Sequence, residues 1–331
     1  MARSKNSSYW QAMLNTISNV VPTFWNIFVV MASGNTSNNN YQHLQDIFTP
    51  DSDGRVRFFT SLKDAYDACE SNNNDVILLD ANSTHTLTAM LTVSKNRVHF
   101  IGMDWCGRQF WQGTKVSMWV TAVATDIATI KNTGVRNSFV NLKIMNANTV
   151  AQALYTFVEW GEYTYFKNCD FDKETLLDQT TASAFVCNGD SPQFFNCTFG
   201  MLTLQDTGDI IRAPFRITKE IAGTGKVLRD AYLENCLFFK FAGGTTACHI
   251  YSAADADLER MLLLKNCMFV AHKLGSLPAQ AIKGAATFTQ WQVLVVNPAF
   301  ANCTKLSTTT WVFAVGSAAT AATAGLNVQA A

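Results

Sequence analysis

Charged side chains are scarce in this sequence. Lys, Arg, Asp and Glu make up 15% of the 331 residues, whereas globular domains average about 25%. Basic and acidic residues number 25 each, so the formal net charge is zero. No run of basic residues and no stripe of interleaved basic and aromatic residues is present, which argues against a surface that follows a phosphate backbone. We therefore expect no nucleic-acid partner.

The sequence has nine cysteines but no Cys-x-x-Cys motif. This absence excludes zinc ribbons and thioredoxin-type redox chemistry. An odd count also prevents complete pairing within one chain, and five of the cysteines follow an asparagine and lie beside hydrophobic residues. Free, buried thiols that act as small apolar side chains fit this pattern. We expect no metal, no cofactor and a reducing compartment of assembly, such as a cytoplasm.

The N-terminal residues lack the pattern of a secretory leader. Ser7, Ser8 and a Tyr-Trp pair follow the first basic residues, where a leader would have an apolar core. Residues 10–30 are apolar overall, but they include Asn15 and Asn19, which would be costly inside a bilayer. We therefore expect neither a secretion signal nor a membrane partner.

Apolar residues, by contrast, are abundant. Hydrophobic residues make up 48% of the chain, and 8 Trp, 8 Tyr and 23 Phe are among them. A sequence this apolar and this poor in charge is not that of a disordered chain. It predicts a large buried interior.

Asparagine-cysteine pairs recur through the second half of the sequence, each beside apolar or aromatic residues. Their loose interval of about thirty residues is typical of a solenoid of stacked coils, and the longer intervals imply inserted loops near 205–230 and 272–290. Asparagines at one corner of successive coils can bond to each other, and a buried amide left unpaired costs roughly 1–3 kcal/mol. We therefore expect a structural ladder of stacked amides. Its asparagines are Asn168, Asn196, Asn235, Asn266 and Asn302.

The segment before these pairs has the pattern of a short helix followed by strands. Ser61 can cap a helix whose apolar stripe includes Tyr66. Apolar runs at 75–79 and at 98–101, the second closed by Gly102, predict buried strands.

The capping helix, the strand that ends at Gly102, a further strand at 137–144 and the asparagine-cysteine segments together resemble right-handed parallel β-helices of the pectin-lyase-like kind. The resemblance covers residues 57–312. It implies an all-β solenoid of roughly nine coils and about 45 Å in length. Residues 1–56 are then an N-terminal arm of a helix plus a strand, and residues 313–331 an Ala/Thr-rich C-terminal tail.

Within this fold class, the chain looks like the β-helical virion proteins of tailed bacteriophages, which commonly assemble as homotrimers. The free cysteines, the apolar arm and the lack of a convincing catalytic cluster agree with that resemblance. We favour a structural virion protein, most simply a homotrimeric capsid decoration or cementing protein. Its partners would be copies of itself and other capsid or virion proteins. It would be located in the virion, which is assembled in the host cytoplasm.

Parallel β-helices often act on polysaccharides, so acidic residues form the alternative hypothesis. Asp170 and Asp172 fall on the same face of one strand, and Asp190, at a turn, is placed to join them from the next coil. In a tail-spike-like depolymerase or lyase these three residues would be the catalytic candidates. In a structural protein the same charges line a solvated strand edge and resist sideways pairing. We favour the interpretation as a solvated strand edge and lean towards a protein that is not an enzyme.

A third hypothesis, glycan binding without catalysis, depends on aromatic residues. Trp105, Phe110, Trp111 and Trp119 are crowded into one segment. Such a patch can stack on the sugar rings of cell-surface glycans, or it can seal an interface between subunits, where Trp is enriched. Low charge along the whole chain favours the interface.

Overall fold

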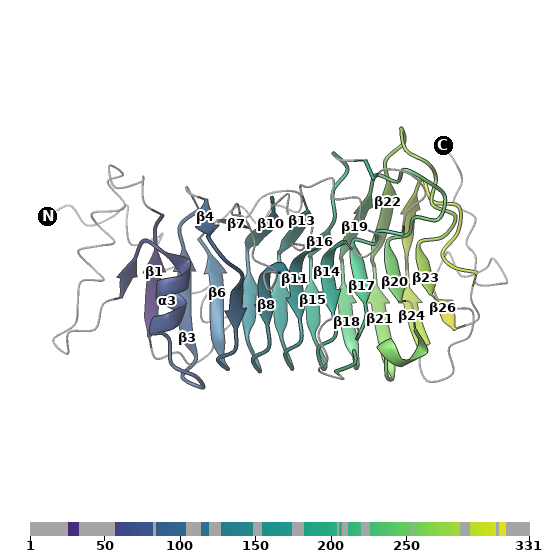
Figure 1. Ribbon diagram of the computed structural model, residues 1–331. Coiled ribbons are helices and arrows are strands. Elements are labelled where there is room, and N and C mark those ends of the chain that lie inside the picture. The colour runs from purple at the N-terminus through teal and green to yellow at the C-terminus, as the bar shows by residue number, and fades with distance from the viewer. Residues whose placement is uncertain are drawn as a thin grey trace, which may run out of the picture.

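The computed structural model is a solenoid built from parallel sheets (Figure 1). It describes residues 26–32, 57–81, 84–103, 114–118, 127–147, 154–173, 182–203, 205–206, 211–219, 226–252, 254–284, 292–308 and 311–315.

Three sheets, which we call A, B and C, run along the solenoid. Successive strands of the chain belong to different sheets, and each pairs in parallel with its counterparts one coil before and one coil after. In sheet A, for example, β12 pairs with β9 and with β15. The predicted fold, an all-β right-handed parallel β-helix, is confirmed.

The 11 strands of sheet A are, in spatial order, β2 (Phe58–Phe59), β1 (Ile27–Val30), β3 (Asp75–Leu79), β6 (Val98–Gly102), β9 (Ser138–Val140), β12 (Tyr165–Lys167), β15 (Gln193–Phe195), β18 (Ala231–Glu234), β21 (Met261–Lys265), β24 (Gln292–Val296) and β26 (Val312–Val315). The 8 strands of sheet B are β4 (His85–Leu87), β7 (Thr114–Met118), β10 (Leu142–Asn146), β13 (Asp170–Lys173), β16 (Thr198–Phe199), β19 (Leu237–Lys240), β22 (Met268–Ala271) and β25 (Ala299–Ala301). The 7 strands of sheet C are β5 (Leu91–Val93), β8 (Ala128–Asn132), β11 (Tyr155–Glu159), β14 (Ser183–Cys187), β17 (Phe215–Ile217), β20 (Ile250–Ser252) and β23 (Ile282–Gly284).

The helix α3 (Leu62–Ala68) lies at the N-terminal end of the solenoid, against β1, β2 and β3 (Figure 1). Its N-cap is Ser61, whose hydroxyl accepts a hydrogen bond from the backbone N–H of Asp64 at 3.3 Å. The apolar side of the helix, which includes Tyr66, is buried. The predicted capping helix is confirmed. The described residues contain one further helical element, the 3-10 turn η1 (Asp255–Asp257), and no helix among them is long and apolar enough to cross a membrane.

The two proposed domain boundaries both fall within sheet A. β1 lies between β2 and β3, with Val29 opposite Phe58 on one side and opposite Leu78 on the other. The strand of the N-terminal arm is therefore a rung of the solenoid. At the other end, β26 runs past residue 312. The helix expected in the arm and most of the tail lie outside the described residues.

Phenylalanine rings fill the interior in three columns, one against each sheet. Phe166 stacks on Phe139 with ring centroids 5.3 Å apart and on Phe194 at 4.7 Å, which matches a rise of about 4.8 Å per coil. Rings of different columns meet edge to face, as Phe185 and Phe194 do at an interplanar angle of 85°. Such pairs contribute about 0.5–1.5 kcal/mol beyond the area they bury, so the columns tie each coil to the next. The columns are Phe100, Phe139, Phe166 and Phe194; Phe171, Phe199, Phe238, Phe269 and Phe300; and Phe157, Phe185 and Phe215.

The asparagines of the repeat form turns. Asn168, Asn196, Asn235 and Asn266 each follow a sheet A strand and precede a sheet B strand, at what we call the A–B corner. Their φ angles lie between 51° and 54°, in the left-handed region. Asparagine enters this region more easily than other residues with a side chain because its short amide can bond locally. The repeat therefore encodes a backbone turn.

The prediction for Asn302 is wrong. This residue follows β25 of sheet B, and its Nδ2 donates to the carbonyl of Ala271 at 3.0 Å. Asn297, which follows β24 and has a φ of 49°, takes the A–B corner instead. Asn141, with a φ of 56°, is an earlier member of the same column. The alignment of the repeat depends on its asparagine-cysteine pairs, and Asn302 precedes Cys303. It misses Asn297 because Pro298 follows that residue where the repeat has cysteine.

The amide ladder is partial. The Nδ2 of Asn168 donates to Asn141 Oδ1 at 2.9 Å, and the Nδ2 of Asn196 donates to Asn168 Oδ1 at 3.3 Å. Asn235 makes no such bond with a described residue. It is exposed, so water can satisfy its amide and the ladder need not be complete.

Thiols line the inner side of the A–B corner. Cys169, Cys197, Cys236 and Cys267 are at most 1% exposed and belong to the same hydrophobic core as the phenylalanines. The eight described cysteines are all free and buried. The prediction of free, buried thiols is confirmed for them.

Candidate functional site

Two aspartates lie next to each other on the outer side of sheet B. Asp170 and Asp172 belong to β13, and Phe171 between them packs in the interior. Residues two apart on a strand share a face, as predicted. The two are 4% and 1% exposed, so the expected solvated strand edge is wrong for this pair. We call Asp170 and Asp172 the acid pair.

Lys143, on the neighbouring strand β10, brings a positive charge to the acid pair. It stands opposite Asp170 in the register, and its Nζ lies 3.0 Å from Asp172 Oδ2. This ammonium stabilises a negative charge on Asp172. No hydrogen bond to either oxygen of Asp170 comes from the described residues. Burial, followed by the charge of Asp172, raises the pKa of Asp170 well above its usual range, which favours the protonated form of Asp170.

Asp190 does not join the acid pair. It lies at the C–A corner, the turn from a sheet C strand to the next sheet A strand. Its carboxylate accepts a hydrogen bond from the Ser191 hydroxyl at 2.8 Å and lies 3.8 Å from Arg229 and 3.7 Å from Arg260. Between Asp172 and Asp190 the chain passes along β14 of sheet C, which places them on different sides of the solenoid.

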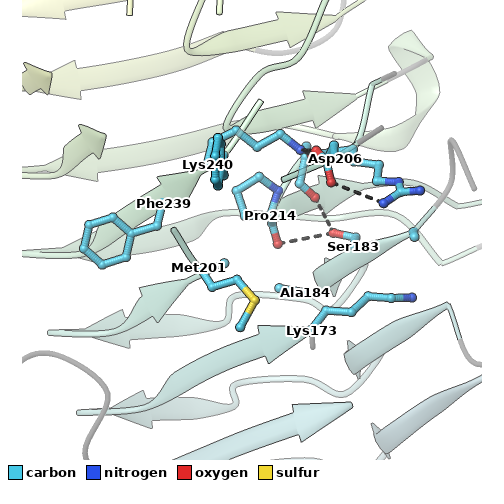
Figure 2. A pocket seen from close by; sticks show the side chains of 13 residues that line it. Lys173, Ser183, Ala184, Met201, Asp206, Pro214, Phe239 and Lys240 are labelled. Carbon is cyan, nitrogen blue, oxygen red and sulfur yellow. Dashed lines mark hydrogen bonds and ion pairs between the residues drawn. The ribbon is translucent and has the colours of Figure 1, made fainter. Parts of the chain in front are cut away.

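A cavity of about 70 Å³ lies at the B–C corner, the turn from sheet B to sheet C. We call it the corner pocket. Lys173 ends β13 and Lys240 ends β19, whereas Asp206 and Arg212 come from the segment between β16 and β17. Figure 2 shows Lys240 and Asp206 close together, with Lys173 at some distance from them.

The charged groups of the corner pocket are bonded to one another and to the backbone. The Lys240 ammonium donates to the carboxylate of Asp206 and to the carbonyl of Arg212, and Arg212 Nη1 lies 3.2 Å from Asp206 Oδ1. Lys173 Nζ donates to the carbonyl of Leu154 at 2.8 Å. Burial lowers the pKa of Lys173 to about 7, and the charge of Arg212 adds to the shift. Burial also lowers the pKa of Lys240.

Gly200 connects the corner pocket to the acid pair. Phe199 stands opposite Phe171 in the register, so Gly200 takes the position of Asp172 one coil further on. Its φ is 82°, and a Cβ at this position would lie 2.4 Å from the carbonyl oxygen of Phe239. A side chain is therefore excluded there, because the backbone of Phe239 and the ring of Pro214 occupy the space.

A third buried carboxyl, Glu159 at the end of β11, is a structural group. It accepts hydrogen bonds from Asn132 Nδ2 and Thr164 Oγ1 at 3.0 Å, and from the N–H of Gly161 at 2.6 Å. Burial raises the pKa of Glu159 to about 8, although these hydrogen bonds oppose the shift. With 0% exposure, this carboxyl stabilises the C–A corner from the inside.

Sequence reasoning found the acid pair but missed Lys143 and the corner pocket. One signal was available: the long interval between Asn196 and Asn235 implied an inserted segment, and both Asp206 and Arg212 lie in that interval. The described residues contain no group of three His, Cys, Asp or Glu side chains that could hold a metal ion. The aromatic candidates lie outside the described residues; they are Trp105, Phe110, Trp111 and Trp119.

Comparison with known proteins defines the fold class. No protein-family model and no curated protein matches the sequence. The structure is similar to the pectin methylesterase from Aspergillus niger, with 14% identity over 90% of this chain and 83% of that chain and a TM-score of 0.52. The pectin methylesterase PemA from Erwinia chrysanthemi gives 14% identity, 88% and 81% coverage and a TM-score of 0.46. The Dettilon tailspike protein gives 11% identity, 88% and 66% coverage and a TM-score of 0.35.

The chain is therefore a pectin-lyase-like right-handed parallel β-helix. At 14% identity, the similarity to the Aspergillus niger enzyme agrees with the fold alone, and the activity is argued from the site.

Proposed function

We propose that this protein is a polysaccharide-active β-helix that hydrolyses an ester carried by a polysaccharide, with the acid pair as its reaction centre. The observation that carries the proposal is the arrangement of two buried carboxyl groups on one face of β13, one with a raised pKa and one beside a lysine. A proton donor and a negatively charged nucleophile side by side are the two groups that acyl transfer requires. The pectin methylesterases that share the fold support an ester of a sugar acid as the substrate class.

The reaction proceeds in two balanced steps. The Asp172 carboxylate attacks the ester carbonyl carbon, the bond to the alcohol oxygen breaks, and Asp170 gives its proton to the departing oxygen. Asp170, now ionised, takes a proton from water as the water oxygen attacks the acyl-Asp172 carbonyl. The acid leaves, and both aspartates return to their starting states. Lys143 stabilises Asp172 as the anion at the start and at the end.

Glycosidic cleavage by the acid pair is the alternative reaction. Glycosidases keep their two carboxyl groups about 5–9.5 Å apart to accommodate the sugar and a water molecule. Asp170 and Asp172 stand two residues apart on one face of β13, and the products released distinguish the two reactions.

The test measures which product the purified chain releases from methyl-esterified and acetylated polysaccharides. We expect release of methanol or acetate, and a loss of roughly 10²–10⁴-fold in rate for Asp170→Asn or Asp172→Asn. Asp190→Asn is the matched control and should keep full activity, because Asp190 lies at another corner. New reducing ends or unsaturated sugars without ester cleavage would replace this proposal with a depolymerase or a lyase.

A structural virion protein is the second candidate, and burial of the acid pair favours it. At 4% and 1% exposure, the two aspartates present almost no surface to a polymer. In this case the chain would be a homotrimeric capsid decoration protein with other virion proteins as partners. Burial of the acid pair agrees equally with a non-catalytic binder of cell-surface glycans. A trimer by light scattering, together with no turnover of any polysaccharide, would favour the decoration protein, whereas glycan-array binding would favour the glycan binder.

A further inference from the structure

The corner pocket gathers cationic side chains from separate segments around one small space. Lys173 ends β13 and Lys240 ends β19, two strands of sheet B that lie on either side of β16, and Arg212 approaches from the segment before β17. Asp206 is the one carboxylate among the described residues that line it. Three cations and one anion in a shared cavity favour a negatively charged ligand.

Lys240 retains one hydrogen-bond donor for such a ligand. An ammonium has three N–H donors. Two of them are used by Asp206 and by the Arg212 carbonyl, and no other described residue bonds to Lys240 Nζ. The side chain is only 5% exposed, so the third donor has little access to bulk water.

The apolar walls of the corner pocket strengthen the electrostatic interactions of its charged groups. Met201, Pro214 and Phe239 line it beside the cations, as Figure 2 shows. Charge interactions grow as the surroundings become less polar, and a buried cation without full compensation is costly. The lowered pKa values of Lys173 and Lys240 report this cost. A bound anion would offset it.

The size of the corner pocket limits the ligand. A volume of about 70 Å³ corresponds to roughly five water-sized positions. That space suits one carboxylate, sulfate or phosphate group and is too small for a sugar ring.

We propose that the corner pocket binds one oxyanion group, a carboxylate, a sulfate or a phosphate, through Lys240, Lys173 and Arg212. The oxyanion can be part of a polymer that extends along sheet B or a free ion. Binding here does not require any reaction at the acid pair, so it can succeed or fail independently of the proposed esterase activity.

Titration calorimetry of the full chain tests the proposal with three probes: galacturonate, inorganic sulfate and inorganic phosphate, each compared with uncharged galactose. We expect one-to-one binding of at least one oxyanion and none of galactose. The probe with the highest affinity identifies the chemistry of the ligand. Asp170→Asn should bind it as the wild type does, which separates this site from the acid pair.

Three variants locate the bound anion. Lys240→Met should weaken binding at least about tenfold, because a charge-assisted hydrogen bond is lost. Asp206→Asn should tighten it, because a competing carboxylate is removed. Lys265→Met, which alters a partly exposed lysine paired with Glu234 at another part of the molecule, is the control and should not change the affinity. If Lys240→Met does not fold, Lys173→Met replaces it. Absence of saturable binding for all three oxyanions, or equal affinity in Lys240→Met and the wild type, overturns the proposal.

Discussion

The A–B corner and the B–C corner of this solenoid are built in opposite ways. At the A–B corner, successive coils repeat one solution: an asparagine with positive φ, then a small buried residue and an inward phenylalanine. At the B–C corner, successive coils differ, and the residues around the corner pocket include Lys173, Arg212 and Lys240. The first corner repeats because each coil must turn in the same way to stack on its neighbour. The second has charged groups and a cavity, which stacking alone does not require.

The comparison separates two groups of residues: those of the repeated corner, which hold the coils together, and those of the corner pocket, which can act on a ligand. Substitutions in the repeated parts should reduce stability. Substitutions in the acid pair or the corner pocket should change binding or activity with smaller effects on folding. Three further predictions test this separation.

The largest effect is expected in the phenylalanine columns. Phe199→Ala removes a ring that is 0% exposed and stacks on Phe171 and Phe238, so the free energy of unfolding should fall by about 3–5 kcal/mol. Met201→Ala, two residues further along in the pocket wall, should cost about 1 kcal/mol because Met201 is partly exposed. Urea denaturation of both variants measures the difference. Equal losses would show that the corner pocket contributes to stability as much as the core does.

The second effect concerns the C–A corner and depends on pH. Because the pKa of Glu159 rises to about 8 in the folded protein, folding favours its protonated form. This stability is fully present below about pH 4 and is lost as the pH rises through about 8, by on the order of 2–4 kcal/mol. Glu159→Gln cannot ionise, so its stability should change less between pH 5 and pH 8. Thermal denaturation at both pH values, with Glu259→Gln at a partly exposed carboxyl as control, measures this. A wild type equally stable at both would contradict the prediction.

The smallest effect is expected at the A–B corner. Asn235→Ala places a residue with a Cβ and no amide at a φ of 54°, which should cost about 1 kcal/mol. Asn235→Gly loses the same amide but accepts this φ, so it should cost only a few tenths of a kcal/mol. Chemical denaturation can resolve the two. If both variants lost the same stability, the amide rather than the backbone turn would be the reason for asparagine at this corner.

Much of the fold could be predicted from the sequence because solenoid coils repeat. The asparagine-cysteine interval indicated the coil length. Sheet A has 11 strands, sheet B 8 and sheet C 7, numbers that lie on either side of the roughly nine predicted coils. The helix that Ser61 caps is also set by local sequence. The alignment failed in the last coil. There Pro298 follows the turn residue Asn297 where the repeat has cysteine, and the Asn302-Cys303 pair comes after a sheet B strand instead.

Less of the candidate site could be predicted. Asp170 and Asp172 were found because alternation along one strand is a local property. Their burial and their contact with Lys143 depend on the neighbouring coil, whose register the sequence does not state. The corner pocket depends on Arg212 and Asp206, which lie in an inserted segment without a periodic pattern.

By itself, the sequence determined that the chain winds into stacked coils, because the same turn residue and the same inward side chains return at each coil. It also determined that the chain has a large apolar interior and that its cysteines are buried as free thiols. Only the tertiary structure decided which charged residues meet at the outer side of sheet B and at the B–C corner. Those contacts join residues from different coils, and hydrogen bonds between parallel strands, rather than nearness along the chain, set their register.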